Sequence, residues 1–87
     1  MSFTVLWSHD AEQRLAQLWL DAANREAVTR AAHEIDSTLK KDPEHSGESR
    51  SEGRRFMAVP PLAVYFRAST EDRTVRVLTV RRILERS

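Results

Sequence analysis

Three short β-type runs, separated only by tight turns, fill most of the second half of this chain. They span residues 54–59, 62–67 and 74–82, and each is rich in aliphatic, aromatic and β-branched residues. The pair Pro60-Pro61 lacks two backbone donors, so it must lie in the turn between the first two runs. The polar residues 69–73 predict the turn before the last run. Strands joined so closely are expected to pair antiparallel.

The first half of the chain predicts one strand and two helices. Residues 3–7 are typical of a strand, with Phe3, Val5 and Trp7 on one face. Ser8 and Asn24 are expected N-caps of two helices. Apolar residues then recur at helical spacing, giving two stripes that predict a helical hairpin: Ala11, Leu15, Leu18, Trp19 and Ala22, then Val28, Ala32, Ile35 and Leu39.

Alternation along the last strands predicts which side chains lie beneath the helices. In the middle run, Leu62, Val64 and Phe66 share the face expected to pack on the helices. Ala63, Tyr65 and Arg67 share the other, open face. The run 74–82 is apolar on both faces, so we expect it to be central and covered on both sides.

One polar segment interrupts this order. Residues 42–53 hold no apolar side chain except Pro43, and a structureless connection of that length is typical of a functional or disordered loop. Apart from this loop, residues 1–87 are expected to form a single domain. The last five residues are too few for more than a tail or one helical turn.

Composition excludes several classes of protein. The chain has no cysteine, which disfavours a disulfide framework and excludes a thiolate metal site. Its three histidines lack metal-ligand spacing, so we expect no metal and no cofactor. No apolar run is long enough for a membrane span and no signal-peptide pattern is present, so a cytoplasmic protein without membrane partners is expected.

The charge is distributed unevenly along the chain. Through residue 44, five basic residues face eight acidic ones, a net of −3; from residue 45 onward, nine arginines face five acidic residues, a net of +4. This asymmetry predicts a polyanionic or acidic partner for the sheet. Twelve of the fourteen basic residues are arginine, which suits phosphate contacts and stacking on bases. A GC-rich genome would produce the same excess, and the sequence does not separate the two explanations.

The whole pattern resembles the RelE/ParE superfamily of toxins from type II toxin–antitoxin modules, which include plasmid-stabilisation modules. The matching residues are spread along the chain: Trp7, 15–19, 35–36, Leu39, 42–43, 47–50, 61–66 and 75–82. The resemblance implies an α+β fold of order β-α-α-β-β-β, with a helical hairpin packed on one face of a small, mainly antiparallel sheet. It also implies a cytoplasmic toxin that a small cognate antitoxin inhibits by wrapping a helix or strand around it.

This superfamily contains two kinds of toxin. RelE-like members cleave mRNA in the ribosomal A site, whereas ParE-like members bind DNA gyrase without nuclease chemistry. Arg54 and Arg55, with Arg81 or Arg82, match two basic positions of the family nucleases. The second late strand begins with Pro61-Leu62 instead of an arginine, and no tyrosine or histidine follows Arg82. A ribosome-associated endoribonuclease is the first hypothesis; a ParE-like toxin, or a degenerate member that only binds its antitoxin, stays an alternative. The sequence does not decide whether the protein forms a homo-oligomer.

Cleavage at an RNA 2′-hydroxyl needs a base, cations beside the phosphorane and an acid for the leaving oxygen. The resemblance and the positive charge lead us to predict catalytic roles for Arg54, Arg67 and Arg82, and RNA-binding roles for Arg50, Arg55, Tyr65 and Arg81. Guanidinium groups do not deprotonate at neutral pH, so the base would have to be Glu48, His45 or Tyr65.

Each of these residues also has a structural interpretation. Arg67 would pair with Glu71 or Asp72 across the turn, and Arg50 would anchor the polar loop through a carboxylate. Tyr65 would be a half-buried residue of the sheet. Because Arg81 and Arg82 alternate faces, only one of them can join a shared site.

Overall fold

The computed structural model describes residues 2–83, and its elements form a five-stranded sheet with two helices. The sheet has the order β1-β5-β4-β3-β2; β1 runs parallel to β5 and the other neighbours are antiparallel. This confirms the predicted α+β fold, with one more strand than expected. Of the predicted C-terminal tail, residues 83–87, only Ile83 is described, and its amide donates to the Pro61 carbonyl at 2.9 Å. The elements are β1 (Thr4–Trp7), α1 (His9–Asp21), α2 (Arg25–Lys41), the 3-10 turn η1 (Pro43–His45), β2 (Glu48–Ser49), the 3-10 turn η2 (Ser51–Gly53), β3 (Arg55–Val59), β4 (Leu62–Ser69) and β5 (Thr74–Arg82).

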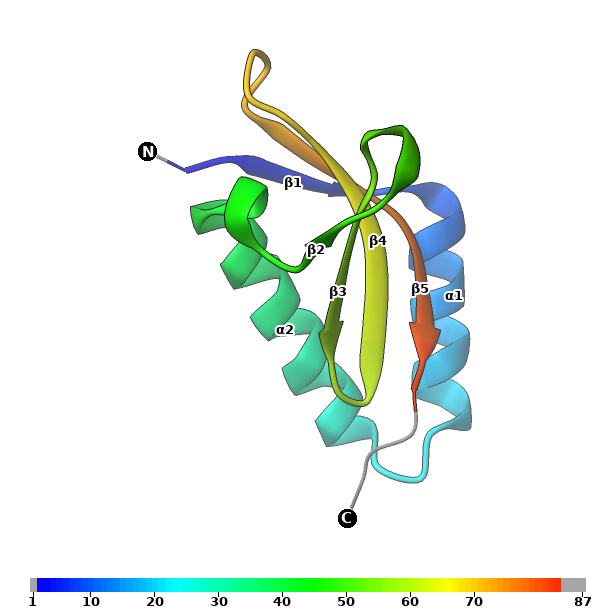
Figure 1. Cartoon of the computed structure of the whole chain (residues 1–87). Helices are drawn as coiled ribbons and strands as arrows, with labels where there is room; N and C mark the ends of the chain where they lie inside the picture. Colours follow the sequence, from blue (N-terminus) through cyan, green and yellow to red (C-terminus); the bar gives the residue numbers. More distant parts are fainter. Residues whose placement is uncertain (1, 84–87) are drawn as a thin grey trace.

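Both helices begin at the caps that the sequence predicts. The Ser8 hydroxyl accepts from the Ala11 amide at 3.0 Å, and it also donates to the carbonyl of Leu78 at 3.0 Å, so the start of α1 is tied to β5. The Asn24 side chain accepts from the Ala27 amide at 3.1 Å. In Figure 1, α1 lies beside β5 and α2 lies on the β3 side of the sheet. The caps therefore fix where each helix meets the sheet.

The core lies between this helix pair and one face of the sheet. Ile35 and Leu39 of α2 are completely buried, as are Leu62 and Phe66 of β4, and Val64 is 1% exposed. The predicted inward set of the middle strand is confirmed. Tyr65 and Arg67 point to the opposite face, which is left uncovered by helices and which we call the open face. Burial of large apolar side chains on one side of β4 therefore decides which residues reach solvent on the other.

A β-bulge explains why the last strand looks apolar on both faces. The pairing between β4 and β5 is regular from Thr74 to Val77, then shifts so that Leu78 is the extra residue before Thr79. The shift changes the alternation, and Val75, Val77 and Val80 are all fully buried. The strand is central, as expected. The expectation that both its faces are covered is wrong, because the bulge puts its buried valines on one face.

The polar segment 42–53 is folded, contrary to the structureless loop expected from its composition. It contains the two turns η1 and η2 and the short edge strand β2, which pairs with β3. Gly47 has φ +69°, and an added Cβ there would lie 2.1 Å from the carbonyl oxygen of Phe56. Only glycine permits this close approach, and the approach lets β2 lie beside β3.

Replacing Phe66 by alanine is expected to destabilise the protein by about 3–5 kcal/mol, since the ring is completely buried at the centre of the sheet. Leu20→Ala is the matched control: that side chain is 56% exposed, and its loss should change the free energy of unfolding by less than about 0.5 kcal/mol. Urea denaturation followed by circular dichroism measures both values. Similar losses in the two variants would contradict the proposed core.

Candidate functional site

A row of four side chains crosses the open face from β2 to β5. Glu48 pairs with Phe56, Phe56 with Tyr65, and Tyr65 with Thr79 in the strand register. The rings of Phe56 and Tyr65 are 5.1 Å apart between centroids and tilted by 58°. We call these four residues the aromatic row. It offers two partly exposed rings with a carboxylate at one end, which is an arrangement suited to stacking on bases.

An arginine row lies beside the aromatic row. Arg67 and Arg76 are directly paired across β4 and β5. Continuing the β3–β4 register by one residue beyond Arg55 sets Arg54 next to Arg67, and the Arg50 amide donates to the carbonyl of Arg54 at 2.7 Å. The row therefore reads Arg50, Arg54, Arg67, Arg76 from β2 to β5. Its members are spread over residues 50–76 of the sequence, and the strand register brings them into one line.

Two guanidinium groups of the arginine row lean over the aromatic row. The Arg50 guanidinium lies 5.1 Å from the Phe56 ring centroid, and that of Arg54 lies 5.7 Å from the Tyr65 ring centroid. The Arg50 Nη2 atom is also 3.1 Å from the Glu48 carboxylate, with the two side chains 42% and 68% exposed. Cation–π contacts and one exposed ion pair therefore join the rows into a single cluster, although each contact alone contributes little, about 1 kcal/mol or less.

Of the three residues predicted as a possible catalytic base, two lie in the cluster and one lies outside it. Glu48 belongs to the cluster. His45 lies in η1, where its Nδ1 atom is 2.9 Å from Asp42, and the structure does not bring it into the aromatic row. Tyr65 lies in the middle of the row with a partly exposed side chain, so the half-buried position expected for it is confirmed.

The structure separates Arg81 from Arg82. Arg81 pairs with Ala63 and so lies on the open face, one step along the strands from Tyr65. Arg82 pairs with Leu62, whose side chain is completely buried beneath the helices, so Arg82 lies on the helix side at the strand's end. Only Arg81 lies on the same face as the cluster, as alternation requires, so the position of Arg82 does not support the catalytic role predicted for it.

Arg55 holds the polar segment in place. Arg55 follows Arg54 in the chain, so its side chain lies on the opposite face of the sheet. Its Nε atom donates to the Ser46 carbonyl at 3.0 Å, and its Nη2 atom donates to the Gly47 carbonyl at 3.2 Å. The structure thus places Arg55 on the segment that carries β2, and its guanidinium is engaged before any ligand arrives. The loop-anchoring role expected for Arg50 belongs here to Arg55, which uses carbonyl oxygens instead of a carboxylate.

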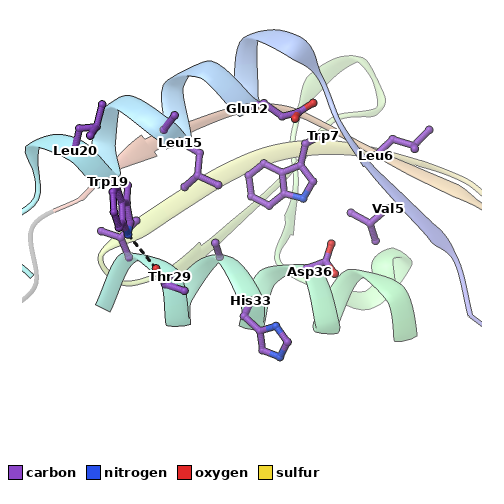
Figure 2. Close-up of a pocket in the computed structure, with 13 residues that line it drawn as sticks. Val5, Leu6, Trp7, Glu12, Leu15, Trp19, Leu20, Thr29, His33 and Asp36 are labelled. Carbon is purple, nitrogen blue, oxygen red and sulfur yellow. Dashed lines mark hydrogen bonds between the residues drawn. The ribbon is translucent and has the colours of Figure 1, made fainter. Parts of the chain in front are cut away.

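A second surface lies on the helix side. A groove of about 950 Å³ runs between α1 and α2, and Figure 2 shows Trp7 of β1 lying between the two helices. Leu6 at one end of the groove and Trp19 and Leu20 at the other end are 41%, 40% and 56% exposed, which is high for large apolar side chains. An apolar groove with exposed side chains of this size is typical of an interaction site. We call it the helix groove.

The wall of the helix groove at Trp19 is fixed by polar contacts. The indole Nε1 of Trp19 donates to the Thr29 hydroxyl at 3.1 Å, the bond dashed in Figure 2, and so links the two helices. Arg25 lies 4.7 Å from the ring centroid of Trp19 and donates to the carbonyls of Trp19 and Leu20 at the end of α1. An apolar ligand would therefore meet a largely preformed surface.

The charged residues that line the helix groove include two carboxylates. Asp36 is 3.1 Å from the Lys40 amine. Glu12 makes no ion pair within residues 2–83. The groove thus offers apolar walls and one carboxylate whose charge is not balanced by a neighbour.

Two negative findings apply to residues 2–83. They contain no group of three or more acidic, histidine or cysteine side chains placed to hold a metal ion. Neither helix in this part of the chain has the length and apolar character needed to cross a membrane.

Solved structures similar to this one identify the fold. The RelBE2 toxin–antitoxin complex from Mycobacterium tuberculosis matches with a TM-score of 0.80 and 19% identity over 98% of this chain and 95% of that one. The chromosomal ParDE system from P. aeruginosa gives 0.70 and 15% over 94% and 97%, and the isolated E. coli RelE toxin gives 0.55 and 15% over 98% and 87%. No family model and no curated protein matches the sequence. The chain has the fold of the RelE/ParE toxins, which confirms the resemblance at the level of fold.

Sequence reasoning missed two residues of the open face. Phe56 was assigned only to a strand, and Arg76 was not singled out among the arginines. Both are found by cross-strand register: Phe56 pairs with Tyr65, and Arg76 pairs with Arg67. The predicted pairing of Arg67 with Glu71 or Asp72 is not observed among the ion pairs of residues 2–83, and Asp72 instead accepts from the Ser69 hydroxyl at 3.3 Å.

Gly47→Ala is expected to displace β2 and with it Arg50 and Glu48, because the added Cβ would clash with the Phe56 carbonyl. Gly53→Ala is the matched control: it has a similar φ of +75°, but an added Cβ there has no atom within 4 Å. Hydrogen exchange of the β3 amides should accelerate strongly in the first variant and little in the second. Equal acceleration would show that positive φ, and not the contact with β3, dominates.

Proposed function

We propose that this protein is the toxin of a type II toxin–antitoxin module and acts as a RelE-like, ribosome-associated mRNA endoribonuclease. The observation that carries the proposal is the joined pair of rows on the open face, in which Glu48 and two rings lie beside four arginines. Unpaired bases stack on aromatic side chains, and guanidinium groups bind the phosphates between them. The fold supports the same family of function.

The rows suggest a division of chemical roles. Glu48 takes the proton of a 2′-hydroxyl, whose oxygen then attacks the adjacent phosphorus and forms a cyclic phosphate as the bond to the 5′-oxygen breaks. The Tyr65 hydroxyl supplies a proton to that 5′-oxygen. Two strand spacings, about 10 Å, separate the backbones at Glu48 and Tyr65, which leaves room for a phosphate between base and acid. Arg50, Arg54 and Arg81 stabilise the charge on the phosphorane.

A specific feature favours a second candidate, a ParE-like toxin that binds a protein such as DNA gyrase. Glu48 is 68% exposed and already paired with Arg50, so its carboxylate is poorly fixed in position for a catalytic base. In this alternative the arginine row binds an acidic protein surface and no bond is broken. A purified system of gyrase and relaxed plasmid separates the candidates: supercoiling that is inhibited while mRNA stays intact would support the ParE-like toxin and overturn the nuclease.

In a coupled translation reaction, Glu48→Gln and Arg54→Gln should each lower the rate of codon-positioned mRNA cleavage about 10²- to 10³-fold, the loss expected for a transition-state charge or a catalytic base. Primer extension on the message measures the cuts. Arg81→Gln should lower cleavage while Arg82→Gln should not, because only Arg81 lies on the open face. Arg30→Gln, an exposed ion-paired residue of α2, is the general control. A loss with Arg82→Gln but not with Arg81→Gln would refute the assignment.

We also propose that the helix groove binds the cognate antitoxin. Its apolar walls at Leu6, Trp19 and Leu20 fit the apolar face of an amphipathic segment, and Glu12 would pair with a basic residue of that segment. Toxin–antitoxin complexes among the similar structures support a partner of this kind. The occupant is expected to be the product of a short neighbouring gene.

Trp19→Ala and Leu20→Asp should each weaken antitoxin binding by about 2 kcal/mol or more, since both remove apolar contact from the rim of the groove. Isothermal titration calorimetry with the antitoxin measures the affinity. Glu12→Gln should give a smaller loss that disappears at high salt, because screening removes the contribution of an exposed charge. Full affinity in the Leu20→Asp variant would exclude the groove as the antitoxin site.

A further inference from the structure

We propose that Arg67 and Arg76 form a phosphate-binding site that holds the backbone of single-stranded RNA beyond the stacked bases. The inference rests on the proposed RNA-directed function and deepens it in three ways. It assigns a binding role to Arg76, and it states that the substrate strand crosses the sheet from β2 toward β5. It also makes Arg67 a residue that binds the RNA backbone, next to Arg76 at the β5 end of the row.

The two arginines face each other without a balancing charge. They are direct cross-strand partners on β4 and β5, and both are exposed. Neither makes an ion pair with any residue between 2 and 83. The acidic residues of the adjacent turn do not reach them: Asp72 is bonded to Ser69. The hydroxyl of Thr70 in that turn donates to Glu44, which is a separate contact.

The facing pair of arginines lowers the stability of the folded protein unless an anion binds between them. Like charges directly opposite each other on a sheet repel, and the cost is about 0.2–1 kcal/mol in the free protein. A phosphodiester oxygen between the two guanidinium groups would turn this repulsion into two charge-assisted hydrogen bonds. Among anions, the phosphate is favoured because the same row carries Arg54 and Arg50 toward β2, so that a chain of phosphates can bind along it.

The spacing of the two rows fits one strand of nucleic acid. Arg67 and Tyr65 are two residues apart on the same face of β4, a distance of about 6.6 Å along the strand. A backbone lying above the arginine row therefore leaves its bases above Phe56 and Tyr65, once the Arg50 and Arg54 guanidinium groups move from these rings onto phosphates. The fit requires unpaired bases, because a duplex encloses its base faces and could present only phosphates. The geometry accordingly selects single-stranded over double-stranded RNA.

The test measures binding of a fluorescein-labelled twelve-uridine oligonucleotide to the full chain by anisotropy, across a series of salt concentrations. Each phosphate contact contributes about 0.7 to the slope of log K against log salt for single strands. Arg67→Gln and Arg76→Gln should each reduce the slope by about 0.7 and weaken binding alike for uridine and adenosine oligonucleotides. Phe56→Ala should weaken binding without changing the slope. Arg30→Gln should change neither quantity.

A stability measurement separates binding loss from misfolding. Without RNA and at low salt, Arg76→Gln should raise the Tm slightly, since it removes the cross-strand repulsion; a lowered Tm together with lost binding would overturn the inference. An unchanged slope in Arg76→Gln would also overturn it, even if the wild type cleaves mRNA normally. Tight binding to a twelve-base-pair RNA duplex, or no binding to the single strand at 50 mM salt, would do the same. A reduced slope in a protein that cuts no message would support the site while the nuclease proposal fails.

Discussion

The burial of Leu62, Val64 and Phe66 beneath the helices is the constraint on which both surfaces of this protein depend. Because side chains alternate along a strand, this burial turns Ala63, Tyr65 and Arg67 to the open face. A slip of one residue would bury Arg67 and expose Phe66, which the core cannot tolerate. The register of β4 then positions its neighbours, so Phe56, Arg76 and Arg81 reach the same face through pairing. Apolar packing on one side thus arranges the charge on the other.

The β-bulge in β5 lets one strand bury its valines on the helix side and place its arginines on the open face. Val75 and Val77 pack under the helices on one side of the bulge, and Val80 does so on the other. A regular strand would have turned Val80 outward together with Arg76. The extra residue, Leu78, restores burial of Val80 and leaves Arg81 on the open face with Arg76. The Leu78 carbonyl accepts from the Ser8 hydroxyl, so the irregular point of the strand also holds the start of α1.

Local patterns were sufficient to predict most of the fold, and non-local register was needed for the site. The helices with their caps at Ser8 and Asn24, and the late strands, follow from periodicity and turn chemistry that act within a few residues. The strand β2 was missed because Glu48 and Ser49 have no apolar side chain; its pairing depends on Gly47 approaching β3. The arginine row was predicted only in part for a related reason: Arg50, Arg54 and Arg67 were named as site residues, but Arg76 and the alignment of all four were not. Its members lie at four places along the sequence, and only the pairing of four strands brings them together.

The two surfaces lie on opposite sides of the sheet, and this separation limits how a partner could inhibit the protein. The helix groove is formed by α1, α2 and β1, whereas the arginine row lies on the face away from the helices. An apolar segment seated in the groove would leave Arg54 and Arg67 free to bind phosphate. A partner that uses the groove and also blocks the open face must therefore continue around an edge of the sheet. Because the repulsion between Arg67 and Arg76 favours any anion, an acidic extension of the partner would bind the same guanidinium groups as the RNA that we propose.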